Sequence, residues 1–276
     1  MRARTAGNSM RWWPVPLLRG TNCVLLINDL AVWKMADQLE QVEVALAALV
    51  NEAGGPDALI TPRGWQHMGL VIIDAVYSLQ ADYDTVVMPM LKRYCDAAPD
   101  LDWPTVDDPS RAEHDAKRLI EFLGPMDIER RCEIFNRQIG PGTARTGRPG
   151  RLKAEIVVEV AGVLVDHDAA TVDKFAIASV DCPQLKAEFL WIPGVGIACW
   201  KYMLNLSKVE AIKPDTMVLR WLDQTLGSTP TPSDGANLIE AATVRLQDRG
   251  LEVTIRQIDH LVWRKASGRS LTEAER

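Results

Sequence analysis

The chain has 276 residues, of which 47% are hydrophobic and 25% are charged, and its formal net charge is −6. This composition is typical of a folded globular protein with one or two domains, and the acidic balance excludes a generally basic polyanion binder. No apolar run reaches the ~18 residues of a membrane span, and the N-terminal arginines do not form a secretory signal. We therefore expect a cytoplasmic protein without a membrane partner, associated with the nucleoid if bacterial.

Apolar residues recur at helical spacing along almost the whole chain. The first clear case is Asp37–Asn51, and a Gly-Pro pair ends that region soon afterwards. Further helices are predicted, in chain order, at Gly64–Ser78, Thr85–Ala97, Ser110–Phe122, Met126–Arg137, Arg151–Val165, Thr171–Ser179, Gln184–Trp191, Ile197–Leu206, Pro214–Leu226, Ala236–Arg249 and Thr254–Lys265. Only two short runs, Cys23–Ile27 and Leu251–Ile255, are strand-like. The predicted fold class is all-α.

A glycine- and proline-rich loop separates two of these helices, and its composition excludes a helix. From Gly140 to Lys153 the chain contains four basic residues and no acid. Three of the four, Arg145, Arg148 and Arg151, are candidate contacts to the phosphates of a nucleic acid. A solvated surface loop is the competing interpretation.

The five cysteines are scattered and form no C-x-x-C pair. This distribution argues against a zinc site and against a disulfide framework, and it is typical of a reducing compartment. The histidines form no metal-ligand pair either. We therefore predict no metal site and no cofactor.

The most informative motif lies between two predicted helices, within residues 184–206. There the chain reads Ile192-Pro193-Gly194-Val195-Gly196, so two glycines one residue apart form a tight turn. Such a turn exposes backbone N–H groups, and the helix that follows adds unpaired N–H groups and a positive dipole end. The combination predicts a phosphate-binding hairpin that contacts DNA through Gly194, Val195 and Gly196.

An acid follows the hairpin at short distance, in the segment Lys213-Pro214-Asp215. Proline is favoured as the first residue of a helix, so we expect Asp215 in the first turn, where the helix dipole favours its ionised form. An ordinary helix start would have the same composition. The hairpin beside it favours a catalytic carboxylate.

Together these motifs resemble the helix-hairpin-helix DNA glycosylases of the endonuclease III superfamily, over about residues 65–226. That family has L-P-G-V-G followed by a V-D-T-H-V-type segment, and Asp215 corresponds to its catalytic aspartate, with Thr216 and Val218 also matching. Ser78-Leu79-Gln80-Ala81 corresponds to the family's S-x-Q-A, whose glutamine fills the gap left by a flipped base. Lys153-Ala154-Glu155-Ile156 corresponds to its K-A-x-x-I helix start.

Two departures from the family refine the expectation. Bifunctional members have a nucleophilic lysine where this chain has Ala198, and no cysteine follows Cys199 to hold the family's iron–sulfur cluster. The resemblance therefore implies a monofunctional enzyme that uses water and needs no cofactor, although a monovalent cation at the hairpin stays open. Lys201, one helical turn further on, is either a DNA contact or an alternative nucleophile.

The resemblance also implies a two-lobed helical glycosylase fold. A central bundle of residues 64–231 carries the hairpin, and residues 1–63 and 232–276 form the other lobe. Candidates for a base pocket are Tyr83, Trp191, Trp200 and Asp74, since a flipped base stacks on flat apolar faces. Core packing competes with this role for each aromatic residue, and a structural hydrogen-bonding role competes for Asp74.

The implied function is removal of a base from double-stranded DNA by a monomer, which leaves an abasic site. Damaged bases and modified bases of foreign DNA, hence repair and defence, remain open as substrates and roles. Three alternatives also remain: a DNA-binding protein without activity, a glycosylase/lyase that uses Lys201, and a helical interaction protein in which Gly194 and Gly196 form a plain turn.

Overall fold

The computed structural model describes residues 21–99, 101–103, 108, 111–140 and 150–272. The chain divides into two compact units, Met1–Gln38 and Leu39–Arg276. Helix α1 (Thr21–Glu52) supplies the described residues of the first unit and continues into the second. All the residues of the candidate site lie in the second unit.

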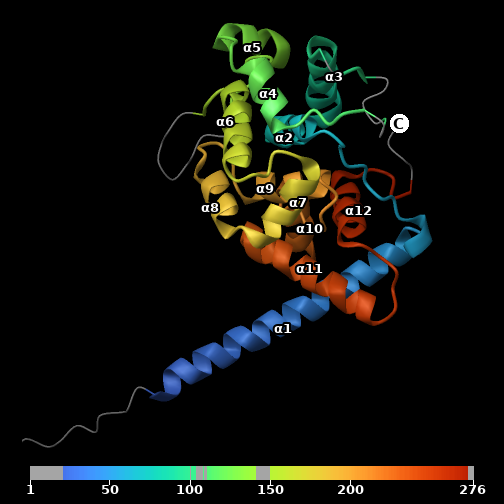
Figure 1. The fold of residues 1–276 in the computed structure, drawn as a ribbon. Helices are drawn as coiled ribbons and strands as arrows, with labels where there is room; N and C mark the ends of the chain where they lie inside the picture. The colour runs from blue at the N-terminus through green and yellow to red at the C-terminus, as the bar shows by residue number, and fades with distance from the viewer. Residues whose placement is uncertain (1–20, 100, 104–107, 109–110, 141–149, 273–276) are drawn as a thin grey trace, which may run out of the picture. The chain divides into compact units, whose positions relative to one another are not determined.

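Regular structure in the described residues is helical throughout, which confirms the all-α prediction (Figure 1). An isolated antiparallel bridge joins Ile139 to Leu152. The remaining elements are η1 (Pro56–Ala58), α2 (Met68–Tyr77), the π-helical turn η2 (Tyr83–Val87), α3 (Met88–Ala97), α4 (Ala116–Leu123), α5 (Ile128–Phe135), α6 (Lys153–Asp166), α7 (Val172–Asp181), α8 (Pro183–Trp191), α9 (Ile197–Leu206), α10 (Thr216–Leu226), α11 (Pro232–Asp248) and α12 (Ile255–Ser267).

Several helix starts are fixed by side chains that accept backbone N–H groups of the first turn. Asp115 accepts from Arg118 N and begins α4, and Asp127 accepts from Arg130 N and begins α5. Helix α4 therefore begins well after the predicted start at Ser110, because Asp115 supplies the cap. Helix α12 begins with a reciprocal capping box between Thr254 and Gln257.

Two other sequence predictions of local structure were wrong. Cys23–Ile27 lies inside α1 rather than in a strand, and the run at Leu251 is a loop that leads into α12. The predicted helix Thr85–Ala97 is confirmed as helical, with its first residues in the π-helical turn η2 and the rest in α3. Pro89 lies in the first turn of α3, where its missing N–H removes no intrahelical hydrogen bond.

Two hydrophobic clusters form the core of the second unit. The first extends from Met68 in α2 to Ala211, just after α9. The second combines the C-terminal part of α1 with residues from Ile212 to Val262 in and around α10, α11 and α12. The loop between α9 and α10 therefore passes from one cluster to the other, and it carries Lys213 and Asp215. The predicted boundaries of two lobes stay a prediction.

Candidate functional site

The predicted hairpin is formed by α8, a five-residue turn and α9. Within the turn, Val195 N donates to the Ile192 carbonyl oxygen at 3.3 Å, and Val195 packs against the first hydrophobic cluster. No side chain caps the start of α9. Its first N–H groups are therefore not capped by a side chain, and their binding of a phosphate stays a prediction.

The two hairpin glycines differ in what they require. Gly194 has a backbone φ of 101°, which L-residues rarely adopt, so glycine is needed there. Gly196 has φ −154°, an extended conformation open to any residue, and an added Cβ would meet nothing within 4 Å. The prediction that the turn needs special backbone angles thus applies to Gly194. At Gly196, glycine keeps the surface beside the start of α9 clear of a side chain.

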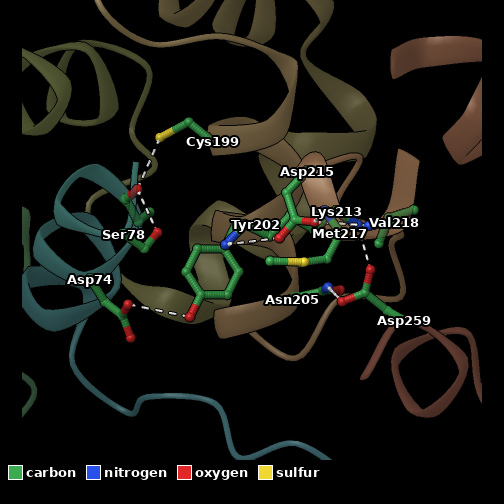
Figure 2. Close-up of polar contacts among 11 residues, drawn as sticks. Asp74, Ser78, Cys199, Tyr202, Asn205, Lys213, Asp215, Met217, Val218 and Asp259 are labelled. Carbon is green, nitrogen blue, oxygen red and sulfur yellow. Dashed lines mark hydrogen bonds and ion pairs between the residues drawn. The ribbon is translucent and has the colours of Figure 1, made fainter. Parts of the chain in front are cut away.

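Asp215 is the N-cap of α10, one position before the first helical turn where we had placed it. Its Oδ1 accepts hydrogen bonds from Met217 N at 2.9 Å and Val218 N at 3.1 Å (Figure 2). The correction has a local cause, because an aspartate side chain satisfies two N–H groups that the helix leaves unpaired. The cap fixes the carboxylate and leaves Oδ2 free of the helix start, and the side chain is 22% exposed.

Lys213 is the neighbour of Asp215 that the sequence analysis missed. Its Nζ lies 4.0 Å from Asp215 Oδ2 and 3.5 Å from the centre of the Tyr202 ring. The ammonium thus contacts the aromatic face and the carboxylate together, and the side chain is only 17% exposed. Its place two residues before Asp215 was a sequence signal, but the contact with Tyr202 on α9 was not readable from the chain.

The backbone of this loop is held by a second buried acid, Asp259 of α12. Asp259 Oδ1 accepts from Lys213 N at 2.6 Å, and its Oδ2 accepts from Asn205 Nδ2 at 2.9 Å (Figure 2). Burial raises the pKa of Asp259 to about 8. The hydrogen bond from Lys213 N lowers this pKa, and the nearby Asp215 carboxylate raises it. Asp259 joins the end of α9 to the loop before Asp215, so the catalytic candidate is positioned by two helices.

Asp74 lies on α2, is 0% exposed and accepts three hydrogen bonds from aromatic side chains. Trp65 Nε1 and the Tyr83 hydroxyl donate to Oδ2 at 2.8 and 3.2 Å, and the Tyr202 hydroxyl donates to Oδ1 at 3.3 Å. Burial raises the pKa of Asp74 to about 6, although these hydrogen bonds and the charge of Lys213 lower it. Asp74 is therefore joined through Tyr202 to Lys213 and Asp215 (Figure 2).

The raised pKa of Asp74 predicts a pH dependence of stability. Between pH 3.8 and about 6 the folded protein holds a proton that the unfolded chain has released. Asp74 therefore makes the free energy of unfolding fall as pH rises through this window, by about 3 kcal/mol in total. From about one pH unit above this pKa, both states are ionised and this contribution no longer changes.

The test compares urea unfolding of the wild type and Asp74→Asn from pH 4 to 7. Asparagine can still accept from Trp65 or Tyr83, and its amide can donate to the Tyr202 hydroxyl. Surface acids that cap helices make the free energy of unfolding rise with pH, and they do so equally in both proteins. The difference in the free energy of unfolding between the two proteins therefore reports Asp74 alone. Parallel curves for the two proteins over the whole range would contradict the prediction.

Lys201 forms an ion pair with an acid of a neighbouring helix. Its Nζ pairs with Glu240 Oε1 of α11 at 2.6 Å, and its side chain is 16% exposed. The same Glu240 oxygen accepts from Ile212 N at 3.0 Å. Lys201 therefore joins α9 to α11 through a partly buried ion pair, and its roles as a DNA contact or as an alternative nucleophile stay predictions.

Gln80 is exposed and has a φ of 52°, directly after the end of α2. The loop that carries it is held by Lys153, whose Nζ donates to the Tyr77 and Leu79 carbonyl oxygens at 2.9 and 2.6 Å. Lys153 is 1% exposed, and this burial lowers its pKa to about 8. The lysine of the predicted K-A-x-x-I start thus anchors the loop that presents Gln80.

The three aromatic pocket candidates have different environments. Tyr83 is half-buried and hydrogen-bonded to Asp74, so it stays beside the candidate site. Trp200 is 2% exposed and packs edge-on against Phe175 and Phe189, so it belongs to the core and its assignment to a pocket wall is corrected. Trp191 is 84% exposed at the end of α8. It lies immediately before the hairpin turn.

Comparison with known protein families assigns the chain to one family. The model of a domain of unknown function (DUF8548) matches residues 40–267. The chain belongs to this family. No curated protein and no solved structure matches significantly. The matched region includes the hairpin and every member of the Asp74–Lys213–Asp215 group, so the candidate site is part of the DUF8548 domain.

The predicted basic loop of this DUF8548 domain is only partly described. Arg145 and Arg148 lie outside the described residues. Arg151 pairs with Glu155 at 3.7 Å and with Glu159 at 2.5 Å. Its guanidinium is thus already neutralised by two acids of α6, which weakens its assignment as a phosphate contact.

The described part of the chain has no group of three or more potential metal-ligating side chains. No helix there combines the length and the apolar character needed to cross a bilayer. The candidate site itself contains two carboxylates, a lysine and two tyrosines.

Proposed function

We propose that the protein is a monofunctional DNA glycosylase with the two-lobed helix-hairpin-helix fold. It flips a damaged or modified base out of double-stranded DNA and hydrolyses the N-glycosidic bond, which leaves an abasic site. The observation that carries the proposal is the state of Asp215. One carboxylate oxygen is fixed by two backbone N–H groups, and the other is next to Lys213 on a partly exposed side chain.

In this proposal the hairpin binds the DNA backbone. The turn at Gly194 and the uncapped start of α9 present N–H groups that suit a phosphate without reading sequence. Gln80, held out by the Lys153-anchored loop, fills the gap left by the flipped base. Trp191, exposed beside the turn, adds an apolar face against the sugar or a base.

The reaction needs a fixed negative charge. Departure of the base builds positive charge on the sugar, as in other glycoside cleavages. A preorganised carboxylate beside that charge stabilises the transition state, and the same group orients or deprotonates the attacking water. Asp215 meets both needs because its cap prevents the side chain from swinging away.

Two neighbouring groups support this carboxylate. Lys213 holds the position of Oδ2 and is itself held by Tyr202 and by Asp259. Asp74 fixes the rings of Trp65 and Tyr83, which form the aromatic side of the base pocket. In this arrangement Asp74 acts on the aromatic walls and Asp215 on the sugar.

Water is the nucleophile in this proposal. Ala198 occupies the position where a lyase would carry its lysine, and the ammonium of Lys201 is engaged by Glu240. The products are then a free base and an intact strand with an abasic site. An imine between enzyme and sugar does not form.

The function is tested by incubation with duplexes that carry alkylated, deaminated, oxidised or phage-type modified bases. We expect mass spectrometry to detect a free base from at least one duplex, and strand breakage only after heat or alkali. Borohydride should trap no covalent protein–DNA adduct. Strand breakage without alkali, together with a trapped adduct, would show that the nucleophile is a lysine and not water. The absence of any released base across the panel would overturn the proposal.

A further inference from the structure

A basic pocket lies apart from the hairpin, where the loop of residues 61–66 meets the end of α9 and the start of α12. Its volume is about 510 Å³, within the usual range for small-molecule sites. Three of its lining residues are cations, Arg63, Lys208 and Arg256. None of its lining residues in the described part of the chain is an acid, although the net charge of the whole chain is −6; Glu210 Oε2 lies next to the pocket and accepts from Arg256 N at 3.0 Å.

Arg256 is the group that most needs a partner there. It is 7% exposed, its Nη2 donates to the Pro62 carbonyl oxygen at 2.6 Å, and its buried Nε has no hydrogen-bond partner. Burial lowers the pKa of this guanidinium; the charges of Glu210 and Asp259 oppose the shift. A buried guanidinium is stabilised by an anion, and its planar fork suits the oxygens of a phosphate.

The pocket wall is fixed before any ligand binds. Trp65 N donates to the Leu206 carbonyl oxygen at 2.9 Å, and a Cβ on Gly64 would approach that oxygen to 2.5 Å. On the other side, Gln257 Nε2 donates to Thr61 Oγ1 at 3.1 Å. The loop is thus held against both α9 and α12, so little ordering is needed on binding.

We propose that this pocket binds a phosphate group, held by Arg63, Lys208 and Arg256 with Thr61 and Gln66 as further hydrogen-bonding groups. The volume leaves room for the rest of a nucleotide-sized molecule beside the phosphate. Two sources share this chemistry, a free phosphorylated small molecule and a backbone phosphate of DNA. The site stands independently of glycosylase activity.

The loop also connects the pocket with the candidate catalytic site. Gln66 and Arg63 line the pocket, while Trp65 between them donates to Asp74. On α12, Arg256 lines the pocket and Asp259, one turn later, holds Lys213. Occupation of the pocket therefore stiffens two elements that position the Asp74–Lys213–Asp215 group.

The test uses inorganic phosphate as the probe, in thermal unfolding and titration calorimetry against sodium chloride at equal ionic strength. Phosphate should raise the melting temperature saturably. The double variant Arg63→Ala/Lys208→Asn should bind phosphate about 10-fold more weakly. Both residues are exposed, and asparagine tolerates the positive φ of Lys208, so the variant should fold.

The matched control is Arg111→Ala/Lys117→Asn, which removes the same two charges from exposed positions on and before α4. It should keep wild-type phosphate affinity. Binding of an unmodified duplex in the presence of phosphate then distinguishes the two sources of the phosphate group. If duplex and phosphate compete, the pocket binds a backbone phosphate of DNA; if both bind at once, it binds a free phosphorylated molecule. The absence of saturable stabilisation beyond chloride, or equal losses in the two double variants, would overturn the proposal.

Discussion

Asp215→Asn is expected to lower the rate of base release by ~10²-fold or more, while the fold and DNA binding persist. Asparagine caps helices as well as aspartate does, and its Oδ1 can accept from the same two N–H groups, Met217 N and Val218 N. The substitution therefore removes the negative charge that the proposed mechanism places beside the sugar, while the helix cap is kept. Single-turnover release of the free base, with enzyme in excess, measures the chemical step directly.

Asp127→Asn provides the matched control. Asp127 is also an N-cap aspartate, at the start of α5, where it accepts one hydrogen bond, from Arg130 N at 2.8 Å, and its side chain is exposed. This variant should release base at the wild-type rate. A wild-type rate for Asp215→Asn as well would remove Asp215 from the mechanism and leave it the role of an ordinary helix cap.

The sequence was sufficient for features set by neighbouring residues. Periodicity and flanking glycines predicted α8, the turn and α9 almost to the residue, because apolar spacing and turn chemistry are local. Asp215 was misplaced by only one position, since an aspartate suits both an N-cap and a first turn. The start of α4 was missed because Asp115, and not the earlier Pro109-Ser110, supplies the cap.

The candidate site depended on contacts that have no local signature. Lys201 and Lys213 are both lysines beside the motif, yet one pairs with Glu240 and the other with Asp215 and Tyr202. Which lysine faces the carboxylate follows from how α9 packs against α11 and the loop. Likewise Trp200 looked like a pocket wall from its place after the hairpin, but its position on α9 turns it into the core.

Asp259 shows the same limit most clearly. It is distant in sequence from the loop it holds, and no motif marks it. Its role follows from the packing of α12 against α10 in the second cluster. The sequence could therefore predict the hairpin and the acid, whereas the groups that orient the acid needed the tertiary structure.

Gly194→Val is expected to weaken binding to duplex DNA by about 10-fold or more, because the turn can no longer aim its N–H groups at a phosphate. Gly194 has φ 101°, a conformation strongly unfavourable for a β-branched residue, so the turn must rearrange. The strain also lowers stability by about 1–3 kcal/mol. Fluorescence polarisation at one fixed salt concentration measures the affinity, and the loss should be similar for duplexes of different sequence.

Gly250→Val is the control that separates a loss of DNA binding from the general effect of backbone strain. Gly250 follows α11 with φ 90°, and a Cβ there would meet nothing within 4 Å. Its replacement should therefore lower stability by a comparable amount while leaving DNA affinity unchanged. Equal affinities for the wild type and both valine variants would show that the hairpin does not hold the DNA backbone. A loss confined to Gly194→Val would assign the phosphate contact to the turn, since both variants carry the same backbone strain.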